Sequence, residues 1–275
     1  MLQILISQIP RIIDKRPYCK EALALYGELI HLMEDMEGVH RPIEVEDSMK
    51  ELKRREGFPL FSRGDLPLDF GRASKHLNRF FDHLRNKGRE DRDGLEKASK
   101  ALTRDSDWAR RLFKAMLEEN GRELSKVARE VDLNPRTLQF LTTLALKPSL
   151  FALRQSLSEE IEKTEWDYGY CPFCGSQPNM AYFDNVGKRF LHCELCNEEW
   201  SYPRINCPFC QNEDQKSLGY FYSDQEKGFR VDFCRGCQRY IKTIDKRIFE
   251  EAGPMELEYL ATIHLDLLAN ENGFK

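Results

Sequence analysis

The sequence predicts an α+β protein with an N-terminal all-α domain, two tandem cysteine-containing β modules and a C-terminal helix. Apolar residues recur at helical spacing through most of the first 165 residues, and the spacing changes to strand-like alternation after Trp166. A helical stripe returns after Gly253-Pro254. We therefore divide the chain into a helical domain at 1–165, a first module at 166–203, a second module at 204–247 and a C-terminal helix at 248–275.

The N-terminal part is expected to form about five to seven helices. Asn134 followed by Pro135 predicts an N-cap with proline at the first helical position, and Lys147-Pro148 is expected to end that helix. The charged stretch 85–97, which contains two glycines, predicts a solvated loop. Apolar stripes predict helices within residues 20–36, 49–55, 73–84 and, almost continuously, 107–161.

The two β modules show the alternation of half-buried strands. Turns around residues 185–188 and 225–228 would join neighbouring strands into two hairpins, each lying between two cysteine pairs. The two modules therefore resemble tandem copies of one ribbon. The predicted strands are 179–184, 189–193, 218–223, 229–233 and 240–245.

Eight of the nine cysteines fall as four Cys-x-x-Cys pairs. Such a pair places two sulfurs on one side of a tight turn, so two pairs that meet across a hairpin supply a tetrahedron of ligands for zinc or iron. Four pairs predict two metal ions, iron or zinc, each in a site made of four cysteines. The predicted ligands are Cys171, Cys174, Cys193, Cys196, Cys207, Cys210, Cys234 and Cys237.

A disulfide framework is the alternative explanation of these pairs, and it is typical of oxidising compartments. Residues 1–10 lack the basic region and the small-residue cleavage site of a secretion signal, and no stretch approaches the roughly 18 apolar residues of a membrane helix. We therefore expect a cytoplasmic protein without membrane insertion, whose paired cysteines bind metal. Cys19 stands alone and is expected to be an ordinary thiol.

Two pairing schemes are open for the metal sites. Hairpin continuity favours sequential pairing, in which the first two cysteine pairs share one metal and the last two share the other, whereas a cross-braced scheme joins the first pair to the third. Four thiolates leave no open coordination position, which disfavours Lewis-acid hydrolysis, although iron would permit one-electron transfer. Gly175 after Cys174 tolerates a positive φ, and Gln211 stands at the matching position after Cys210.

Charge and motifs give no reason to expect a nucleic-acid partner or an enzyme. The net charge is −4, and residues 166–247 hold 11 basic and 11 acidic side chains, without the basic excess of a phosphate-binding ribbon. Residues 124–141 resemble a helix-turn-helix, but a helical hairpin within a core explains the same pattern. His192 could be an exchanged metal ligand, but we expect it to pack or to form a hydrogen bond near the site. Trp200, Tyr202 and Phe209 could stack on nucleic-acid bases, but we expect them to build the core of the modules. No phosphate loop, serine nucleophile or paired carboxylates indicate catalysis.

The residues around the cysteine pairs form a more specific pattern than the pairs alone. It reads Cys-Pro-Phe-Cys-Gly-Ser-Gln-Pro at 171–178, Arg-Phe-Leu-His-Cys-Glu-Leu-Cys at 189–196, Glu199-Trp200, Arg-Ile-Asn-Cys at 204–207, Cys234-Arg-Gly-Cys237 and Tyr240-Ile-Lys. This pattern resembles the formate dehydrogenase accessory protein family FdhE. The resemblance covers about residues 170–244 and continues into the final helix, and residues 133–154 are compatible with the helical segment of the family.

The resemblance implies a helical domain followed by rubredoxin-like, that is zinc-ribbon-like, metal modules. It also implies a cytoplasmic location, iron as a candidate metal, and a non-catalytic role in assembling or activating respiratory formate dehydrogenase. The implied partner is the molybdenum- or tungsten-containing catalytic subunit of formate dehydrogenase before its export. A rubredoxin-like electron-transfer protein and a zinc-ribbon nucleic-acid-binding module are the alternatives.

Overall fold

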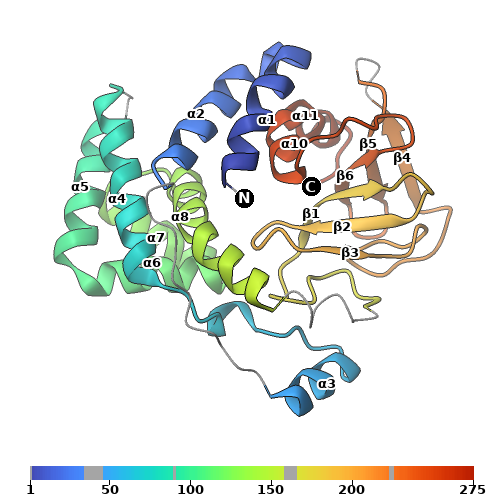
Figure 1. The fold of residues 1–275 in the computed structure, drawn as a ribbon, viewed down its shortest axis with the longest axis horizontal. Helices are drawn as coiled ribbons and strands as arrows, with labels where there is room; N and C mark the ends of the chain where they lie inside the picture. The colour runs from blue at the N-terminus through green and yellow to red at the C-terminus, as the bar shows by residue number, and fades with distance from the viewer. Residues whose placement is uncertain (1, 34–45, 89–90, 158–165, 223–225) are drawn as a thin grey trace. The chain divides into compact units, whose positions relative to one another are not determined.

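The computed structural model describes residues 2–33, 46–88, 91–157, 166–222 and 226–275, and it confirms the α+β class. Helices precede a mixed β-sheet, and two short helices follow it (Figure 1). The chain forms two compact units, which are Met1–Glu28, Glu44–Phe61 and Leu157–Lys275 on the one hand, and Leu29–Ile43 and Ser62–Ser156 on the other. These units describe packing, and the sequence-based domain boundaries at 165, 203 and 247 stay a prediction.

The second unit is helical, and its apolar stripes meet in a core in which Phe80, Phe81 and Leu112 are completely shielded from solvent. The predicted N-cap is confirmed, because Pro135 begins α8 and the Asn134 side chain accepts the backbone N–H of Arg136 at 2.9 Å. The elements are η2 (Arg63–Asp65), α4 (Phe70–Asn86), α5 (Arg92–Arg104), α6 (Ser106–Leu117), α7 (Gly121–Glu130) and α8 (Pro135–Ser156).

The prediction of a solvated loop at 85–97 is wrong at both ends, because α4 runs to Asn86 and α5 begins at Arg92. Its charged residues form the exposed face of an amphipathic helix, while Leu95 and Ala98 are buried in the core of the helical unit. Gly94 is explained by packing rather than by a turn, since a Cβ there would lie 2.7 Å from the carbonyl oxygen of Asp132.

The prediction that Lys147-Pro148 ends a helix is also wrong, because α8 continues through Pro148 to Ser156. Proline cannot donate a backbone hydrogen bond to the carbonyl four residues earlier, which normally kinks or ends a helix. Here Leu146 on one side of the proline and Leu150 and Leu153 on the other are all buried. Packing of both halves of the helix outweighs the missing hydrogen bond.

The first unit combines helices from both ends of the chain with the sheet. Its helical elements include α1, for which the sequence predicts no helix, and the single predicted C-terminal helix is divided in two at Thr262. Thr262 breaks the helical dihedrals and its hydroxyl donates to the Glu258 carbonyl at 2.7 Å. The elements are α1 (Leu2–Lys15), η1 (Pro17–Cys19), α2 (Lys20–His31), which runs across the unit boundary, α3 (Asp47–Arg55), α10 (Met255–Ala261) and α11 (Ile263–Glu271).

One six-stranded sheet contains the strands of both cysteine modules, in the order β3-β2-β1-β6-β5-β4. Within each module the strands pair antiparallel, as the predicted hairpins require. The modules are joined by a parallel pairing of β1 with β6, in which Met180 faces Lys242 and Phe183 faces Asp245. The strands are β1 (Pro178–Phe183), β2 (Arg189–Cys193), β3 (Glu199–Ser201), β4 (Leu218–Tyr222), β5 (Phe229–Cys234) and β6 (Arg239–Asp245).

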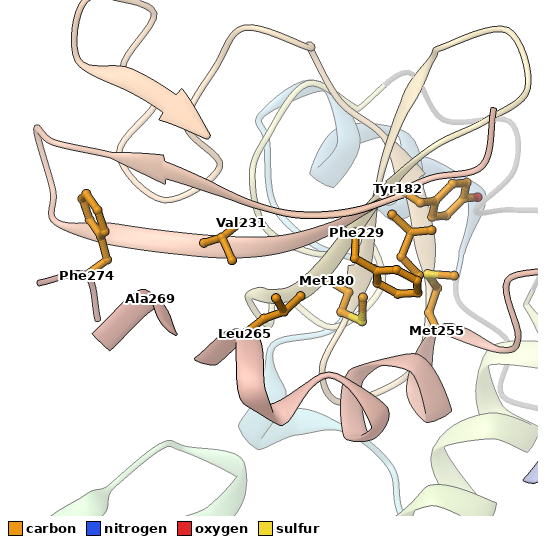
Figure 2. Close-up of a cluster of buried hydrophobic side chains, with 9 residues drawn as sticks. Met180, Tyr182, Phe229, Val231, Met255, Leu265, Ala269 and Phe274 are labelled. Carbon is orange, nitrogen blue, oxygen red and sulfur yellow. The ribbon is translucent and has the colours of Figure 1, made fainter. Parts of the chain in front are cut away.

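The C-terminal helices cover one face of this sheet. Figure 2 shows Met180, Phe229 and Val231 from the strands meeting Met255 and Leu265 from α10 and α11, and all five side chains are buried. Along each strand, every second side chain packs against these helices. The side chains between them point to the other face of the sheet.

Some sequence predictions fall on residues that the structure does not describe, including Met36, Ile161 and part of the turn at 225–228. Across the described ranges, none of the helices combines the length and the apolar composition needed to cross a membrane.

Candidate metal centres

The first cluster consists of Cys171 and Cys174, which precede β1, and Cys193 and Cys196, which close β2 and the turn after it. All four side chains are buried, and their sulfur atoms lie within 4.8 Å of one another. The Sγ atoms of Cys174 and Cys193 are 3.5 Å apart, and those of Cys171 and Cys196 are 3.6 Å apart. Antiparallel pairing of β1 with β2 brings the two cysteine pairs together.

The second cluster consists of Cys207, Cys210, Cys234 and Cys237, and it repeats this arrangement around β4 and β5. The Sγ atoms of Cys207 and Cys237 are 3.7 Å apart, as are those of Cys210 and Cys234. The structure thus groups the eight sulfurs as sequential pairing predicts, whereas a cross-braced scheme would place the first pair beside the third.

Each cysteine pair is followed directly by a residue in the left-handed region of backbone space. The residues are Gly175, Asn197, Gln211 and Gln238, with φ between 58° and 72°. The turns of the first and third pairs are equivalent, because the N–H of Gly175 donates to the Cys171 carbonyl and the N–H of Gln211 to the Cys207 carbonyl, both at 2.9 Å. Gln211 therefore adopts the conformation for which glycine is suited, and the departure from glycine in the third pair is accommodated.

The sulfur spacing fits a single tetrahedral ion in each cluster. With a metal–sulfur distance of about 2.3 Å, neighbouring sulfur atoms of a regular tetrahedron are about 3.8 Å apart. The shortest sulfur–sulfur distances in the two clusters are 3.5–3.7 Å, which is similar. All nine cysteines are free thiols in the structure. Zinc and iron both accept four thiolates, so this geometry is compatible with either ion.

Polar groups approach the sulfur atoms in both clusters. The backbone N–H groups of Leu195 and Cys196 donate to the Cys193 sulfur at 3.4 and 3.5 Å, and the Asn212 side-chain amide donates to the Cys234 sulfur at 3.6 Å. Such hydrogen bonds disperse the negative charge that four thiolates bring together. Sequence reasoning missed Asn212, which lies outside the Cys-x-x-Cys motif and reaches the site only through the fold.

The thiol pKa values differ within each cluster, because burial raises the pKa of some thiols while hydrogen bonds outweigh burial and lower the pKa of Cys174 and Cys234. Burial raises the pKa of Cys171 and of Cys196 well above the usual thiol range. Burial also raises the pKa of Cys234, but hydrogen bonds from the Cys237 backbone and the Asn212 amide outweigh it and bring that pKa to about 7. The binding of a metal ion to the first cluster would therefore displace the protons of Cys171 and Cys196.

The clusters also differ in how far their cysteines are exposed to solvent. The first is buried on all sides, whereas in the second the side chain of Cys210 is exposed and that of Cys237 is half-buried. A closed four-thiolate site has no open position for substrate, so both centres suit structural roles. Of the two clusters, the second includes an exposed cysteine, near which a partner could exchange an electron with a bound iron ion.

The aromatic and histidine residues beside the clusters have structural contacts. Trp200 is buried and donates from its indole N–H to the Tyr168 carbonyl at 3.0 Å, and the buried Tyr202 hydroxyl donates to the Cys207 carbonyl at 3.2 Å. His192 Nδ1 lies 2.9 Å from Asn179 Oδ1, and His192 belongs to neither sulfur cluster. Cys19 is buried and apart from both clusters, as expected for an ordinary thiol.

Asn197, which follows the second cysteine pair, connects the first centre to the C-terminal helices. Its side-chain amide donates to the Glu256 carboxyl group, which also accepts the Tyr26 hydroxyl. Glu256 is only 6% exposed, and burial raises its pKa to about 8. The folded protein therefore keeps this acid largely protonated at neutral pH.

The protonation of Glu256 predicts a pH dependence of stability. An unfolded glutamate ionises near pH 4.5, so between that pH and about 8 the folded state holds a proton that the unfolded state has released, and stability falls as the pH rises. Between pH 5.5 and 7.5 the expected loss is about 2 kcal/mol. Urea unfolding of Glu256→Gln should lack this decline, whereas the exposed control Glu251→Gln should keep it. An unchanged pH slope in Glu256→Gln would contradict the assignment.

The comparisons with known proteins agree with the geometry of the first centre. Residues 170–204 match the family model described as FdhE, central domain. A "Protein FdhE homolog" of Aquifex aeolicus is 38% identical over 141 residues, which cover 50% of this chain and 49% of that protein. A "Protein FdhE homolog" of Shewanella oneidensis is 34% identical over 110 residues, which cover 38% of this chain and 35% of that protein. The matched region thus spans about half or less of these relatives.

The whole fold is similar to that of a solved structure. The crystal structure of the FdhE protein from Pseudomonas aeruginosa aligns with 100% of this chain and 94% of its own, with a TM-score of 0.70 and 20% sequence identity. At that identity the likeness shows a shared fold. Together with the central-domain match and the curated relatives, it confirms the resemblance of this chain to the FdhE family.

Proposed function

We propose that the chain is a non-catalytic, cytoplasmic accessory protein that binds the catalytic subunit of formate dehydrogenase and promotes its assembly or activation. The main support is the pair of four-cysteine clusters on a chain that resembles FdhE proteins. Closed thiolate sites suit a scaffold whose metals, iron or zinc, hold the two modules in a binding-competent shape. Nucleic acid is not expected as a partner.

The energetics favour a structural role for at least one metal. A structural zinc ion contributes on the order of 10–16 kcal/mol in small peptides, whereas a whole domain is usually stable by about 5–15 kcal/mol. Folding of the first module around its buried cluster would therefore depend on the metal. The partner would then recognise a surface that forms only in the metal-loaded protein.

Electron transfer is the second candidate function, and the exposed Cys210 side chain is the observation that favours it. With iron in the second cluster, the accessory protein would accept or supply one electron during activation of the catalytic subunit. A reversible ferric–ferrous spectrum that changes together with the activity of the catalytic subunit would support this role. Zinc in both clusters would exclude it.

Anaerobic affinity purification of the tagged protein from its native host, with mass spectrometry and metal analysis, tests the proposal. We expect the catalytic subunit of formate dehydrogenase to co-purify with the wild-type protein, and to be depleted with a variant that carries Cys171→Ala and Cys174→Ala. Recovery of nucleic-acid-associated proteins that resist nuclease and salt, without the catalytic subunit, would replace the proposal with the nucleic-acid-binding alternative.

A further inference from the structure

The sheet face opposite the C-terminal helices carries a cavity of about 720 Å³. Its floor is formed by alternate residues of β4, β5 and β6, such as Tyr220, Arg230 and Ile241, whereas their neighbour Val231 belongs to the core under the helices. Residues 204–209, which lead into the third cysteine pair, form part of its lining, and Cys207 and Cys234 border it. The cavity therefore lies directly beside the second metal centre.

The cavity is strongly basic, in contrast to the balanced charge of the two modules as a whole. Its lining includes two acidic residues, Asp232 and Asp245. Arg230 Nε lies 2.9 Å from Asp232, and Arg247 Nη2 lies 2.6 Å from Asp245, so two guanidinium groups are neutralised at close range. Five arginines line the cavity, namely Arg189, Arg204, Arg230, Arg239 and Arg247.

The remaining three guanidinium groups are held in place largely without acidic partners. Arg189 is only 3% exposed and donates to the backbone carbonyls of Pro203 and Asn206. Its Nη2 atom lies 4.0 Å from the Asp232 carboxylate, and its Nε has no hydrogen-bond partner among the described residues. Arg239 stacks on the Phe209 ring, with 3.7 Å from guanidinium carbon to ring centroid, and Arg204 lies 5.2 Å from the Phe183 centroid. Guanidinium groups fixed in this way are suited to bind carboxylates.

Large apolar side chains surround the charges and are open to solvent. Ile205, Tyr220, Tyr222 and Ile248 line the cavity and are 50–58% exposed. A small anion would pair with the arginines but would leave these side chains in water. A polypeptide would cover both, and tyrosine and arginine are enriched at the energetic centres of protein interfaces.

We propose that this cavity binds an acidic segment of a partner protein, whose carboxylates pair with Arg204 and Arg239 and whose apolar side chains cover Tyr220 and Tyr222. The inference rests on the proposed function, since the partner is the catalytic subunit of formate dehydrogenase. It adds where the partner binds and what chemistry the bound segment has. Binding there also brings the segment beside Cys207 and Cys234 of the second centre.

Binding of the purified catalytic subunit to the full-length, metal-loaded chain tests the assignment. We expect the double variant Arg204→Gln and Arg239→Gln to raise the dissociation constant by roughly 10- to 100-fold, because two charge-assisted contacts are lost. The matched control Arg122→Gln, an exposed arginine of α7, should bind like wild type. Unchanged metal content and thermal unfolding of the variants establish that they are folded. Cross-linking should map the contact to an acidic segment of the subunit.

The outcomes separate this inference from the function on which it rests. If the wild-type chain does not bind the catalytic subunit at all, the proposed function fails and the inference falls with it. If the wild-type chain binds and the double variant binds equally well, only the inference is overturned. Cross-links to a basic segment, or arginine-dependent binding of ATP or pyrophosphate in place of the subunit, would likewise overturn the acidic-segment assignment.

Discussion

Replacing Cys171 and Cys174 together by alanine is expected to lower the metal content from two ions per chain to one and to unfold the first module. The four buried sulfurs of that cluster sit where β1 and β2 meet, and a metal there contributes on the order of 10 kcal/mol. That exceeds the margin by which most domains are stable. Metal analysis and circular dichroism of the anaerobically purified variant measure both effects.

The single variant Cys19→Ala is the matched control for this prediction. Cys19 is buried, its thiol donates to the Arg16 carbonyl at 2.9 Å, and it belongs to neither cluster. The Cys19→Ala substitution should lower the free energy of unfolding by about 1 kcal/mol and leave two metal ions bound. Retention of two metals and of wild-type stability by the double cysteine variant would show that the first cluster does not hold a metal.

Arg16→Ala is expected to destabilise the first unit by about 3–5 kcal/mol. Arg16 Nη2 lies 2.5 Å from a carboxylate oxygen of Glu258, and the two side chains are 8% and 1% exposed. The pair joins the end of α1 to α10, across 242 positions of the sequence. Truncation of the arginine would leave the Glu258 carboxylate buried without its cationic partner, although the Gly253 N–H would still donate to it at 2.7 Å. Urea unfolding monitored by fluorescence measures the loss.

Arg11→Ala provides the matched control, because Arg11 lies in α1 five positions before Arg16 and pairs with Glu251 at 3.0 Å in an exposed setting. Exposed ion pairs contribute about 0–1 kcal/mol, so this variant should remain close to wild type. Combining Arg16→Met with Glu258→Gln should recover much of the stability, since no unpaired charge stays buried. Equal effects of Arg16→Ala and Arg11→Ala would contradict the importance of the buried pair.

Much of the secondary structure could be predicted from the sequence, because it depends on local patterns. The predicted strand 189–193 coincides with β2, and the predicted strand 229–233 is one residue shorter than β5. The short strand β3 was missed, since three residues show no usable alternation. The predictions for 85–97 and for Pro148 failed where packing in the helical unit outweighed charge and proline signals.

The composition of the two candidate metal centres was also available from the sequence. A Cys-x-x-Cys turn is a local structure, so the four pairs could be anticipated, and hairpin continuity favoured the sequential grouping. The supporting groups Asn212 and Glu256 could not be anticipated, because neither belongs to a motif. Asn212 reaches the second cluster, and Glu256 reaches Asn197 beside the first, through contacts that form only when the chain folds.

Local sequence determined the four Cys-x-x-Cys turns and favoured the sequential grouping, and in the structure one hairpin and its two flanking turns gather each set of four. Three features depend instead on long-range contacts: the two modules share one sheet through the parallel pairing of β1 with β6, the end of α1 is joined to α10 through the Arg16–Glu258 ion pair, and a cavity beside β4, β5 and β6 is lined by arginines. Periodicity identifies a buried face, but which partner covers that face depends on contacts between segments far apart in the chain.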